Sequence, residues 1–419
     1  MNVIWKRNCL CNVSELKIGR KMKILYIAPY FYPAESIGGT ANVLYNLSKA
    51  LIKKGHAVTI YSTDLLNNAQ RVRYPHNTEI DISGIKVIYF SNISNYLAYK
   101  YHFFFSPKFF IHFLRHIKEF DIVHIHEIYT LMNLWVGYWA WKMHIPYLIT
   151  SHGTLEMKKE EGRVAWKKIF LELGGMSMLK TASCLIALTL REKTTFKNLG
   201  LQEDKISVIP NGINENIHIF RNKSSKFLKK FHLPSNSKIL LFLGRIHRKK
   251  GIHLAIKSLS MLKGRYKNLI LVISGPVEDS NYYNSLVNEI ADYGLKEKVF
   301  FTGSLMEEDK NNAFDSSDIF ILTSYSEGLP CTALEAAFSG VPLLVSGDCN
   351  IPEVKLFGSG IIVELNTKSI VSGIIKIMSR ADYRNFYGNN GRKMVKDRFS
   401  LNFMTKNTEK LYFSIHNRL

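Results

Sequence analysis

The sequence predicts an α/β protein made of two doubly wound domains that face one another across a cleft. Three observations support this prediction. The 419 residues exceed what a single hydrophobic core usually serves. Short apolar runs alternate with amphipathic segments, which is the pattern of parallel sheets covered by helices on both faces. The alternation occurs twice, in two series separated by a polar, basic stretch that begins after residue 214.

The first series occupies residues 22–214. It begins with the apolar run KILYIAPY at 23–30, which a loop connects to the helical run TANVLYNLSKALIKKG, ended by Gly55. Further apolar runs predict strands at 56–63, 85–90, 121–127, 146–153, 182–189 and 206–212. Residues 1–21 precede the first strand, and we expect them to be an extension that is not part of the fold.

The second series occupies residues 215–395. Its apolar runs predict strands at 238–246, 269–275, 299–303, 319–324 and 342–347. The last residues, 396–419, have the pattern of an amphipathic helix. Ligands of open α/β sheets bind at the carboxyl ends of the strands, so we expect the site in a cleft lined by both sheets.

The chain is strongly basic, with a formal net charge of +22. Such a charge predicts an anionic partner, which can be a phosphate-bearing substrate, a membrane surface or nucleic acid. No nucleic-acid-binding motif is visible, so nucleic acid is the least favoured of the three. Five scattered cysteines do not form a disulfide framework and indicate a reducing compartment. No run reaches the roughly 18 to 20 apolar residues that span a bilayer.

The segment from residue 96 to residue 120 interleaves aromatic and basic residues. From Phe109 onward, Phe109, Phe113 and either His116 or Ile117 fall at helical spacing. One interpretation is a helix that lies in the headgroup region of an anionic membrane. The other is a helix of the domain core whose basic face is solvated. The sequence favours neither.

Two cations follow the first strand of the second series, in the motif GRIHRKKG at 244–251. Arg245 comes directly after the apolar run, and Lys250 lies near the start of the next helix. A guanidinium binds phosphate oxygens bidentately and an ammonium adds a point charge, so the pair suits a diphosphate and could neutralise it as a leaving group. The alternative, a solvated basic loop, fits His247, Arg248 and Lys249.

Two carboxylates lie in the stretch SYSEGLPCTALEAAFSG at 324–340. Gly328 and the proline two residues later break the chain between strand and helix, so Glu327 belongs to the loop and Glu335 to the helix. The backbone N–H groups of Leu329–Thr332 open that helix. Carboxylates and a donor-rich helix start can together hold a sugar with its phosphates. The alternative is a helix cap with a stray surface glutamate.

Two motifs in the first series have weaker signals. Gly38 and Gly39 lie between a strand and a helix, where glycine lets the backbone approach a phosphate, although the pair alone favours a simple tight turn. His152 closes a strand in TSHGT and can bond a sugar hydroxyl. His124 and His126 alternate along one strand without a third ligand nearby, so they are interpreted as structural and no metal is expected.

In this order the motifs resemble those of the family-4 retaining glycosyltransferases, which have the two-domain GT-B architecture. The resemblance runs from about Lys23 to the C-terminus. It depends on the glycine pair, SHG at 151–153, IPNG at 209–212, GRIHRKKG, and E-x7-E followed by EAAFSGVPLLVS. It implies that Arg245 and Lys250 bind the donor diphosphate and that Glu335 binds the nucleotide ribose.

The same resemblance implies the remaining roles. Glu327 and His152 are the expected catalytic residues, placed beside the donor sugar. Gly38 and Gly39 would approach the phosphates. Gly328, Leu329 and Thr332 would add donors to the same site. The C-terminal helix would cross back to the first domain, which would bind the acceptor.

The family implies a reaction as well. It moves a sugar from a nucleotide sugar, a UDP-, GDP- or ADP-sugar, with retention and without a required cofactor or metal. The departing phosphate oxygen would take the proton of the acceptor. The basic charge and the aromatic segment, rather than the family, suggest the acceptor: a glycan or lipid-linked oligosaccharide of a bacterial surface polysaccharide, at the cytoplasmic face of the membrane. The alternatives are another GT-B enzyme, such as a sugar-nucleotide epimerase or a phosphorylase, and an inactive binding subunit of a polysaccharide assembly complex.

Overall fold

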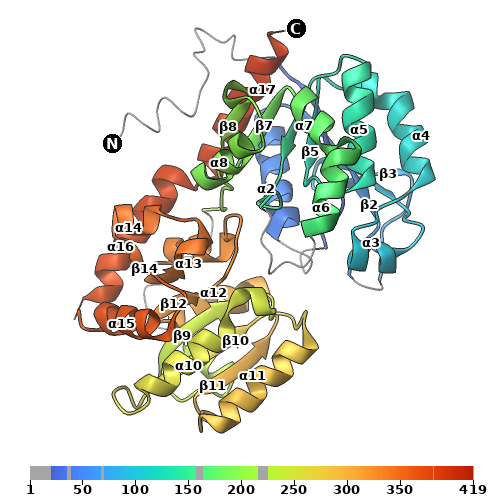
Figure 1. Ribbon diagram of the computed structural model, residues 1–419. Helices are drawn as coiled ribbons and strands as arrows, with labels where there is room; N and C mark the ends of the chain where they lie inside the picture. Colours follow the sequence, from blue (N-terminus) through green and yellow to red (C-terminus); the bar gives the residue numbers. More distant parts are fainter. Residues whose placement is uncertain are drawn as a thin grey trace. The chain divides into compact units, whose positions relative to one another are not determined.

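The computed structural model describes residues 20–34, 39–67, 70–156, 164–215, 225–380 and 382–418. They form two compact units: unit 1 is Met1–Gly212 with Leu401–Leu419, and unit 2 is Ile213–Ser400. Each unit contains one sheet with helices packed on it (Figure 1). The predicted α/β class with two doubly wound domains is confirmed. The extension predicted at residues 1–21 lies almost entirely outside the described residues.

The sheet of unit 1 has eight strands in the order β3-β4-β2-β1-β5-β6-β7-β8. All neighbours pair in parallel except β3, which runs antiparallel to β4 at the edge. The strands are β1 (Lys23–Ala28), β2 (Ala57–Thr63), β3 (Glu79–Ile82), β4 (Ile85–Phe90), β5 (Ile122–His126), β6 (Tyr147–Thr150), β7 (Cys184–Ala187) and β8 (Ile206–Val208). Strand β3 was not predicted, because its four residues alternate polar and apolar and form no apolar run.

The helices of unit 1 cover both faces of this sheet (Figure 1). They are α2 (Gly39–Lys53), α3 (Asn95–Tyr101), α4 (Pro107–His116), α5 (Leu131–Lys142), α6 (Val164–Phe170), α7 (Met176–Thr181), α8 (Leu190–Asn198) and α17 (Leu401–His416). The C-terminal helix α17 is held on unit 1 by Glu409, whose two carboxylate oxygens lie 2.8 Å from Lys54 Nζ and 3.1 Å from His56 Nε2.

Helix α4 contains the aromatic positions for which two interpretations remained open. Phe109, Phe113 and Ile117 are fully buried in the core of unit 1. These three side chains are therefore core residues and cannot contact a membrane. Most of the large apolar side chains exposed in the segment lie instead on and beside α3, with Ile111 of α4 as the exception.

The sheet of unit 2 has six parallel strands in the order β11-β10-β9-β12-β13-β14. The strands are β9 (Lys238–Leu243), β10 (Leu269–Ser274), β11 (Val299–Gly303), β12 (Ile319–Leu322), β13 (Leu343–Ser346) and β14 (Gly360–Val363). The helices are α9 (Ser225–Lys230), α10 (Ile252–Leu262), α11 (Ser280–Asp292), α12 (Glu307–Ser316), α13 (Cys331–Ser339), α14 (Glu353–Phe357), α15 (Thr367–Met378) and α16 (Tyr383–Arg398). The edge strand β14 was not predicted.

The strand order of unit 2 contains a topological switch point between β9 and β12. From β9 the chain adds β10 and β11 on one side, and it then returns to add β12 and β13 on the other. The connections that build the β10–β11 side and those that build the β12–β13 side therefore lie on opposite faces of the sheet, and such a switch point leaves a crevice at the carboxyl ends of β9 and β12. The motifs at 244–251 and 324–340 follow these two strands, so the fold brings them to one crevice.

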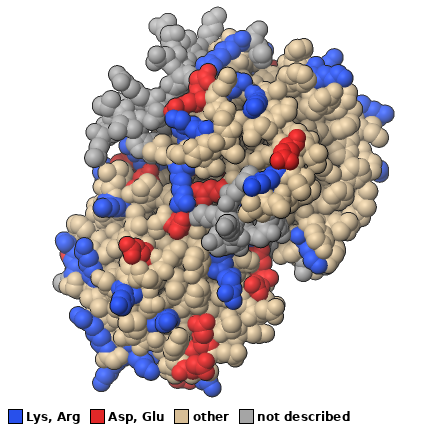
Figure 2. Space-filling model, in the orientation of Figure 1, with Lys and Arg blue, Asp and Glu red and all other residues tan. Residues whose placement is uncertain are grey.

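Two general features bear on possible partners. None of the described helices combines the length and the apolar character needed to cross a bilayer. On the face drawn in Figure 2, Lys and Arg side chains are scattered over the surface with Asp and Glu among them. On that face, the basic excess does not gather into one patch.

Candidate functional site

An ion pair at the switch point of unit 2 joins the two predicted motifs. Lys250 Nζ lies 2.6 Å from Glu327 Oε1. The hydroxyl of Ser324 donates to the same carboxylate oxygen at 2.6 Å. Only 15% of the Lys250 side chain and 11% of the Glu327 side chain are exposed. The pair is therefore largely removed from bulk water, where its electrostatic interaction is stronger than on a surface.

The charge state of Glu327 follows from these contacts. Burial by itself would raise the pKa of Glu327, but the Lys250 ammonium and the hydrogen bonds from Lys250 and Ser324 outweigh it and hold the pKa below its usual 4.5. Glu327 is therefore ionised at neutral pH and is a weak base. An ammonium has three donors, so Lys250 can bond Glu327 and still bind an anionic ligand.

The backbone around Glu327 is fixed by the strand on its other side. Asn350, which follows β13, donates from Nδ2 to the backbone carbonyl of Glu327 at 2.5 Å. The backbone N–H of Glu327 donates to the carbonyl of Asp348 at 3.1 Å. Three neighbouring strands, β9, β12 and β13, thus contribute to placing one carboxylate.

Gly251 allows the turn after β9 to lie against the end of β12. It adopts a left-handed conformation with φ of +63°, and a Cβ there would lie 2.1 Å from the carbonyl oxygen of Thr323. The Thr323 hydroxyl donates to the Gly251 carbonyl at 2.9 Å. Only glycine fits this approach without strain, and the approach positions Lys250 beside Glu327.

Arg245 belongs to a second ion pair at the carboxyl edge of the unit 2 sheet. Its Nη1 lies 2.6 Å from Oε1 of Glu278, in the segment that follows β10. The Arg245 side chain is 41% exposed, so it is much more accessible than Lys250. Glu278 was not among the predicted residues, because nothing in its local sequence shows that β10 lies beside β9.

Helix α13 contains the second carboxylate. Pro330 occupies the N-cap position, and Gly340 ends the helix with φ of +87°. Glu335 accepts a hydrogen bond from Lys310 Nζ of α12 at 3.1 Å, and its side chain is 13% exposed. The two carboxylates of E-x7-E therefore have different cationic partners.

The remaining predicted residues of unit 2 flank the start of α13. Gly328 and Leu329 lie in the loop between β12 and α13, and Thr332 is the second residue of the helix. Leu329 is buried, whereas Gly328 and Thr332 are partly exposed. The loop and helix start thus lie at the carboxyl edge of the same sheet as Glu327.

In unit 1, His152 lies two residues beyond the end of β6. It has a left-handed φ of +51° and is partly exposed. Its Nε2 is 2.9 Å from Nδ1 of His126, the last residue of the neighbouring strand β5. His126 had been interpreted as purely structural, and the sequence did not show its contact with His152.

The loop that contains His152 is held from α8 by a residue that sequence reasoning missed. The buried carboxylate of Glu192 accepts hydrogen bonds from the Ser151 hydroxyl, from the Gly153 backbone N–H at 2.7 Å and from the Leu188 backbone N–H at 2.6 Å. Glu192 also occupies the third position of a helix capped by Thr189. From the sequence alone, this position in the helix start would have indicated only a structural role for Glu192.

The glycine pair is only partly described. Gly38 lies outside the described residues. Gly39 is the first residue of α2, and a Cβ there would have no heavy atom within 4 Å. Tyr30, which follows β1, donates from its hydroxyl to Oε1 of Glu127, which follows β5, at 2.5 Å. This bond links the carboxyl ends of β1 and β5, the two strands at the switch point of unit 1.

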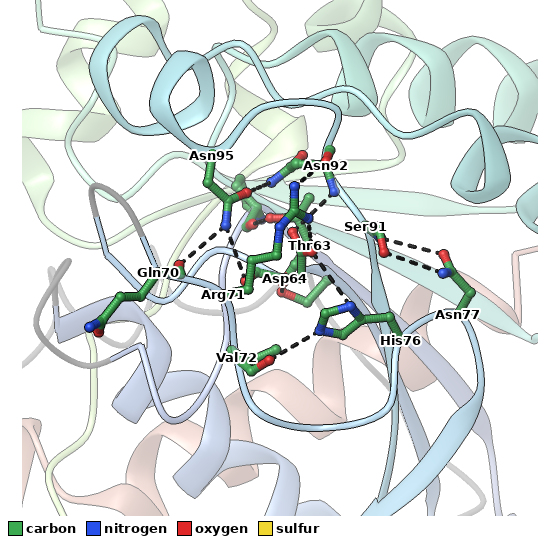
Figure 3. A network of polar contacts seen from close by, with 12 residues as sticks. Thr63, Asp64, Gln70, Arg71, Val72, His76, Asn77, Ser91, Asn92 and Asn95 are labelled. Carbon is green, nitrogen blue, oxygen red and sulfur yellow. Dashed lines mark hydrogen bonds and ion pairs between the residues drawn. The ribbon is translucent and has the colours of Figure 1, made fainter.

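A polar cluster closes the carboxyl ends of β2 and β4 (Figure 3). The fully buried carboxylate of Asp64 pairs with Arg71 Nη1 and accepts from the backbone N–H of Asn92 at 3.0 Å. Arg71 Nη2 also donates to the Asn92 carbonyl at 2.9 Å, and Asn95 donates to two backbone carbonyls of the same loop. The cluster anchors the start of α3.

Among the described residues, no group of three or more His, Cys, Asp or Glu is arranged to hold a metal ion.

The buried histidines predict how unit 1 responds to acid. Burial lowers the pKa of His152 from its usual 6.5 to about 4, and that of His124 to about 3. In the unfolded chain these imidazoles titrate near 6.5, so below that pH the unfolded state binds more protons than the folded state. The free energy of unfolding of unit 1 should therefore fall as the pH is lowered from about 6.5 towards 4.

Tryptophan fluorescence can measure this effect, because all five tryptophans belong to the sequence of unit 1. The urea midpoint should decrease from pH 7 to pH 5, and His152→Gln, which removes one of the titrating groups, should make the decrease smaller. A wild-type midpoint that is the same at pH 7 and pH 5 would contradict the assignment of neutral, buried imidazoles.

Comparison with known proteins identifies two sequence families in the chain. Glycosyltransferase Family 4 matches residues 37–216, and Glycosyl transferases group 1 matches residues 223–394. An uncharacterized glycosyltransferase of Methanocaldococcus jannaschii is 26% identical over 93% of this chain and 98% of its own length. The O-antigen chain mannosyltransferase C of Escherichia coli is 22% identical over 94% of this chain and 99% of its own.

Solved structures have the same fold over nearly the whole chain. The sucrose-phosphate synthase of Thermosynechococcus elongatus matches with a TM-score of 0.76 and 18% identity, over 95% of this chain and 100% of that chain. HepE from Anabaena, in complex with UDP and glucose, matches with a TM-score of 0.73 and 17% identity, over 93% of this chain and 99% of that chain.

Proposed function

We propose that this chain moves a sugar from a nucleotide-sugar donor to a glycan or lipid-linked oligosaccharide acceptor, because it belongs to the GT-B glycosyltransferases, with a family 4 domain followed by a glycosyl transferases group 1 domain. The chain is an enzyme of the hexosyltransferase type. The donor class, the acceptor and the stereochemistry are parts of the proposal.

The Lys250–Glu327 pair is the observation that carries this proposal. It provides a cation and a fixed carboxylate at the switch point of an open α/β sheet, where ligands of such sheets bind. We assign Lys250 and Arg245 to the donor diphosphate, whose charge grows as the glycosidic bond breaks. Glu327 would lie by the donor sugar, and Glu335 would bond the ribose. Gly328, Leu329 and Thr332 would line the site.

In unit 1, we assign Gly38 and Gly39 to the donor phosphates and His152 to a sugar hydroxyl near the reacting carbon. The proposed stereochemistry is retention, with the leaving phosphate oxygen as the acceptor of the incoming proton. The state of Glu327 supports this assignment, because a carboxylate whose pKa is held below 4.5 is poorly suited to be a general base. Glu327 would then act through electrostatics and hydrogen bonding.

A screen of nucleotide sugars tests the proposal. The solved structure of HepE contains UDP and glucose, so UDP-glucose is the first compound, followed by other UDP-, GDP- and ADP-sugars. At 100 times its dissociation constant a donor stabilises the folded protein by about 2.7 kcal/mol, which a thermal shift detects. Each binder is then incubated with enzyme, and the products are analysed for free nucleotide and free or transferred sugar.

The outcomes separate the alternatives. Release of the nucleoside diphosphate with transfer or slow hydrolysis of the sugar supports a glycosyltransferase. An isomerised sugar with the nucleotide still attached would indicate an epimerase, and phosphate-dependent release of a sugar phosphate would indicate a phosphorylase. Binding without turnover, with every acceptor tried, would favour an inactive subunit. If no nucleotide sugar binds, the proposal fails.

The acceptor side of the proposal includes association with an anionic membrane, for which α3 provides a surface. One side of α3 and its flanks expose five large apolar side chains and one lysine, here called the α3 surface: Ile93, Tyr96, Leu97, Lys100, Tyr101 and Phe103. Lys100 lies over the rings of Tyr96 and Tyr101. Aromatic residues with a nearby cation suit the headgroup region, where each Lys or Arg contributes about 1 kcal/mol.

We expect the protein to float with liposomes that contain anionic lipid at low salt, and less so at high salt. Tyr96→Ser/Tyr101→Ser should weaken flotation. The control Met306→Ser/Leu356→Ser removes two side chains of unit 2 that are 77% and 57% exposed, and it should leave flotation unchanged. Absence of flotation at low salt would contradict the membrane proposal, and equal loss in both variants would contradict the role of the α3 surface.

A further inference from the structure

The hydrogen bond between His126 and His152 contains one proton, and its position decides what His152 offers to a ligand. Nδ1 of His126 and Nε2 of His152 are 2.9 Å apart. Both rings are neutral at pH 7, because burial lowers the pKa of each. One nitrogen must therefore donate and the other accept. If Nε2 of His152 accepts, its other nitrogen carries a proton, and His152 presents an N–H donor.

The surroundings of His126 indicate which way the bond runs. His126 is 1% exposed, and among the described residues its Nε2 has no hydrogen-bond partner. Its ring packs on those of Tyr26 and His124, with centroids 5.2 Å and 4.3 Å away. His124 cannot serve as a partner, since its nitrogens are engaged by the Tyr412 hydroxyl at 2.6 Å and the Thr150 hydroxyl at 2.8 Å.

These surroundings make the two directions unequal. If His152 donated, the proton of His126 would be on Nε2, as a buried N–H without an acceptor. If His126 donates from Nδ1, the atom left unpaired is a buried lone pair. Orphaned buried N–H groups are rarer than under-satisfied acceptors, so the second arrangement is favoured.

We propose that His126 is a positioning residue that fixes the tautomer of His152, so that His152 presents its Nδ1–H as a donor beyond the end of β6. Glu192 completes the arrangement by holding the residues on both sides of His152. The proposal rests on the proposed function in one respect, namely that the group met by this N–H is a sugar oxygen of the donor. An N–H donor there suits a hydroxyl or ring oxygen, whereas a bare imidazole nitrogen would require a donor from the ligand.

The tautomer can be measured directly on the full chain without any substrate. The protein is labelled with ¹⁵N-histidine, and two-bond ¹H–¹⁵N correlations are recorded at pH 7. The His152 signals are identified by their loss in His152→Ala. We expect His152 to carry its proton on Nδ1. A proton on Nε2 of His152 would overturn the proposal.

Kinetics of the donor reaction provide the second readout. His126→Phe keeps a ring but removes the hydrogen bond, and we expect kcat to fall at least about tenfold with little change in KM for the donor, as misplacement of a group at the reacting centre does. His126→Asn places an amide N–H near the position of Nδ1 and should restore most of the rate. His126→Asp, which can only accept when ionised, should not. His112→Asn, on α4, is the matched control with an unchanged rate.

The outcomes are distinct. Equal kcat in wild type, His126→Phe and His126→Asp would overturn the positioning role, even if all variants fold. If His126→Phe does not fold, the comparison of the Asn and Asp variants decides. If the wild type turns over no nucleotide sugar, the proposed function fails, while the measured tautomer still confirms or refutes the assignment of the proton.

Discussion

Replacing Lys250 by Met should lower the transfer rate by about 10²–10³-fold, the usual effect of removing one preorganised group that stabilises developing charge. The nearly isosteric Met keeps the stem of the side chain and removes the ammonium that lies 2.6 Å from Glu327. The rate is measured as release of the nucleoside diphosphate from the donor found in the nucleotide-sugar screen. Arg248→Met is the control, because Arg248 lies in the same turn but is exposed over the ring of Tyr282.

The same variant should also lose stability, for a separable reason. Without Lys250, the buried Glu327 carboxylate loses the charge that holds down its pKa, so the pKa should rise. Removing one partner of a buried ion pair costs about 3–5 kcal/mol, whereas replacing both partners is often close to neutral. Lys250→Met/Glu327→Gln should therefore recover much of the melting temperature without recovering the rate.

This double variant distinguishes a structural role of the Lys250–Glu327 ion pair from a functional one. In the wild type, the depressed pKa of Glu327 contributes stability that is present above about pH 4.5 and is lost as the pH falls further. That contribution should be absent from the double variant. A wild-type rate in Lys250→Met, or a rate that returns together with stability in the double variant, would mean that the ion pair only supports the fold.

The strand ends of this protein could be predicted from sequence, and with them much of the site. A buried parallel strand is an apolar run, so its carboxyl end is visible where the run stops. Arg245, Glu327 and His152 all follow such ends, and the structure places each of them at the carboxyl edge of a sheet. The strands that were missed, β3 and β14, lie at sheet edges, where burial is incomplete and the apolar signal is weak.

The partners of these residues could not be predicted in the same way. Which carboxylate meets which cation depends on strand order, and the sequence does not contain that order locally. Glu278 meets Arg245 because β10 pairs with β9, and Lys310 meets Glu335 because α12 packs beside α13. Residues such as Asn350 act through the backbone of a neighbour, for which no motif exists.

The aromatic segment shows a related limit of periodicity. Helical spacing predicted an apolar face for α4 correctly, but spacing does not say whether such a face meets the core or a lipid. Phe109 and Phe113 are buried, while Tyr96 and Tyr101 of the short helix α3 are more than half exposed. These two exposed tyrosines precede the helical spacing that begins at Phe109.

Gly251→Ala should damage stability and activity together, because one backbone contact supports both. The new Cβ would lie 2.1 Å from the Thr323 carbonyl oxygen, and the residue would also be held at φ of +63°. The Cβ is fixed to the backbone of residue 251 and the oxygen belongs to the backbone of Thr323, so no flexible side chain can relieve the clash. The turn after β9 must therefore move away from β12. We expect a loss of about 2–4 kcal/mol, in the upper range for single substitutions, and a rate reduced at least tenfold because Lys250 moves with the turn.

Gly264→Ala is the matched control for this substitution. Gly264 also lies in unit 2, just beyond α10, but a Cβ there meets no heavy atom within 4 Å. It should therefore leave both the melting temperature and the rate close to those of wild type. If Gly251→Ala behaved like Gly264→Ala, the close approach of the turn to Thr323 would not be what positions Lys250. If it lost stability but kept its rate, the pair would reform despite the displaced turn, and the preorganisation assigned to this edge would be wrong.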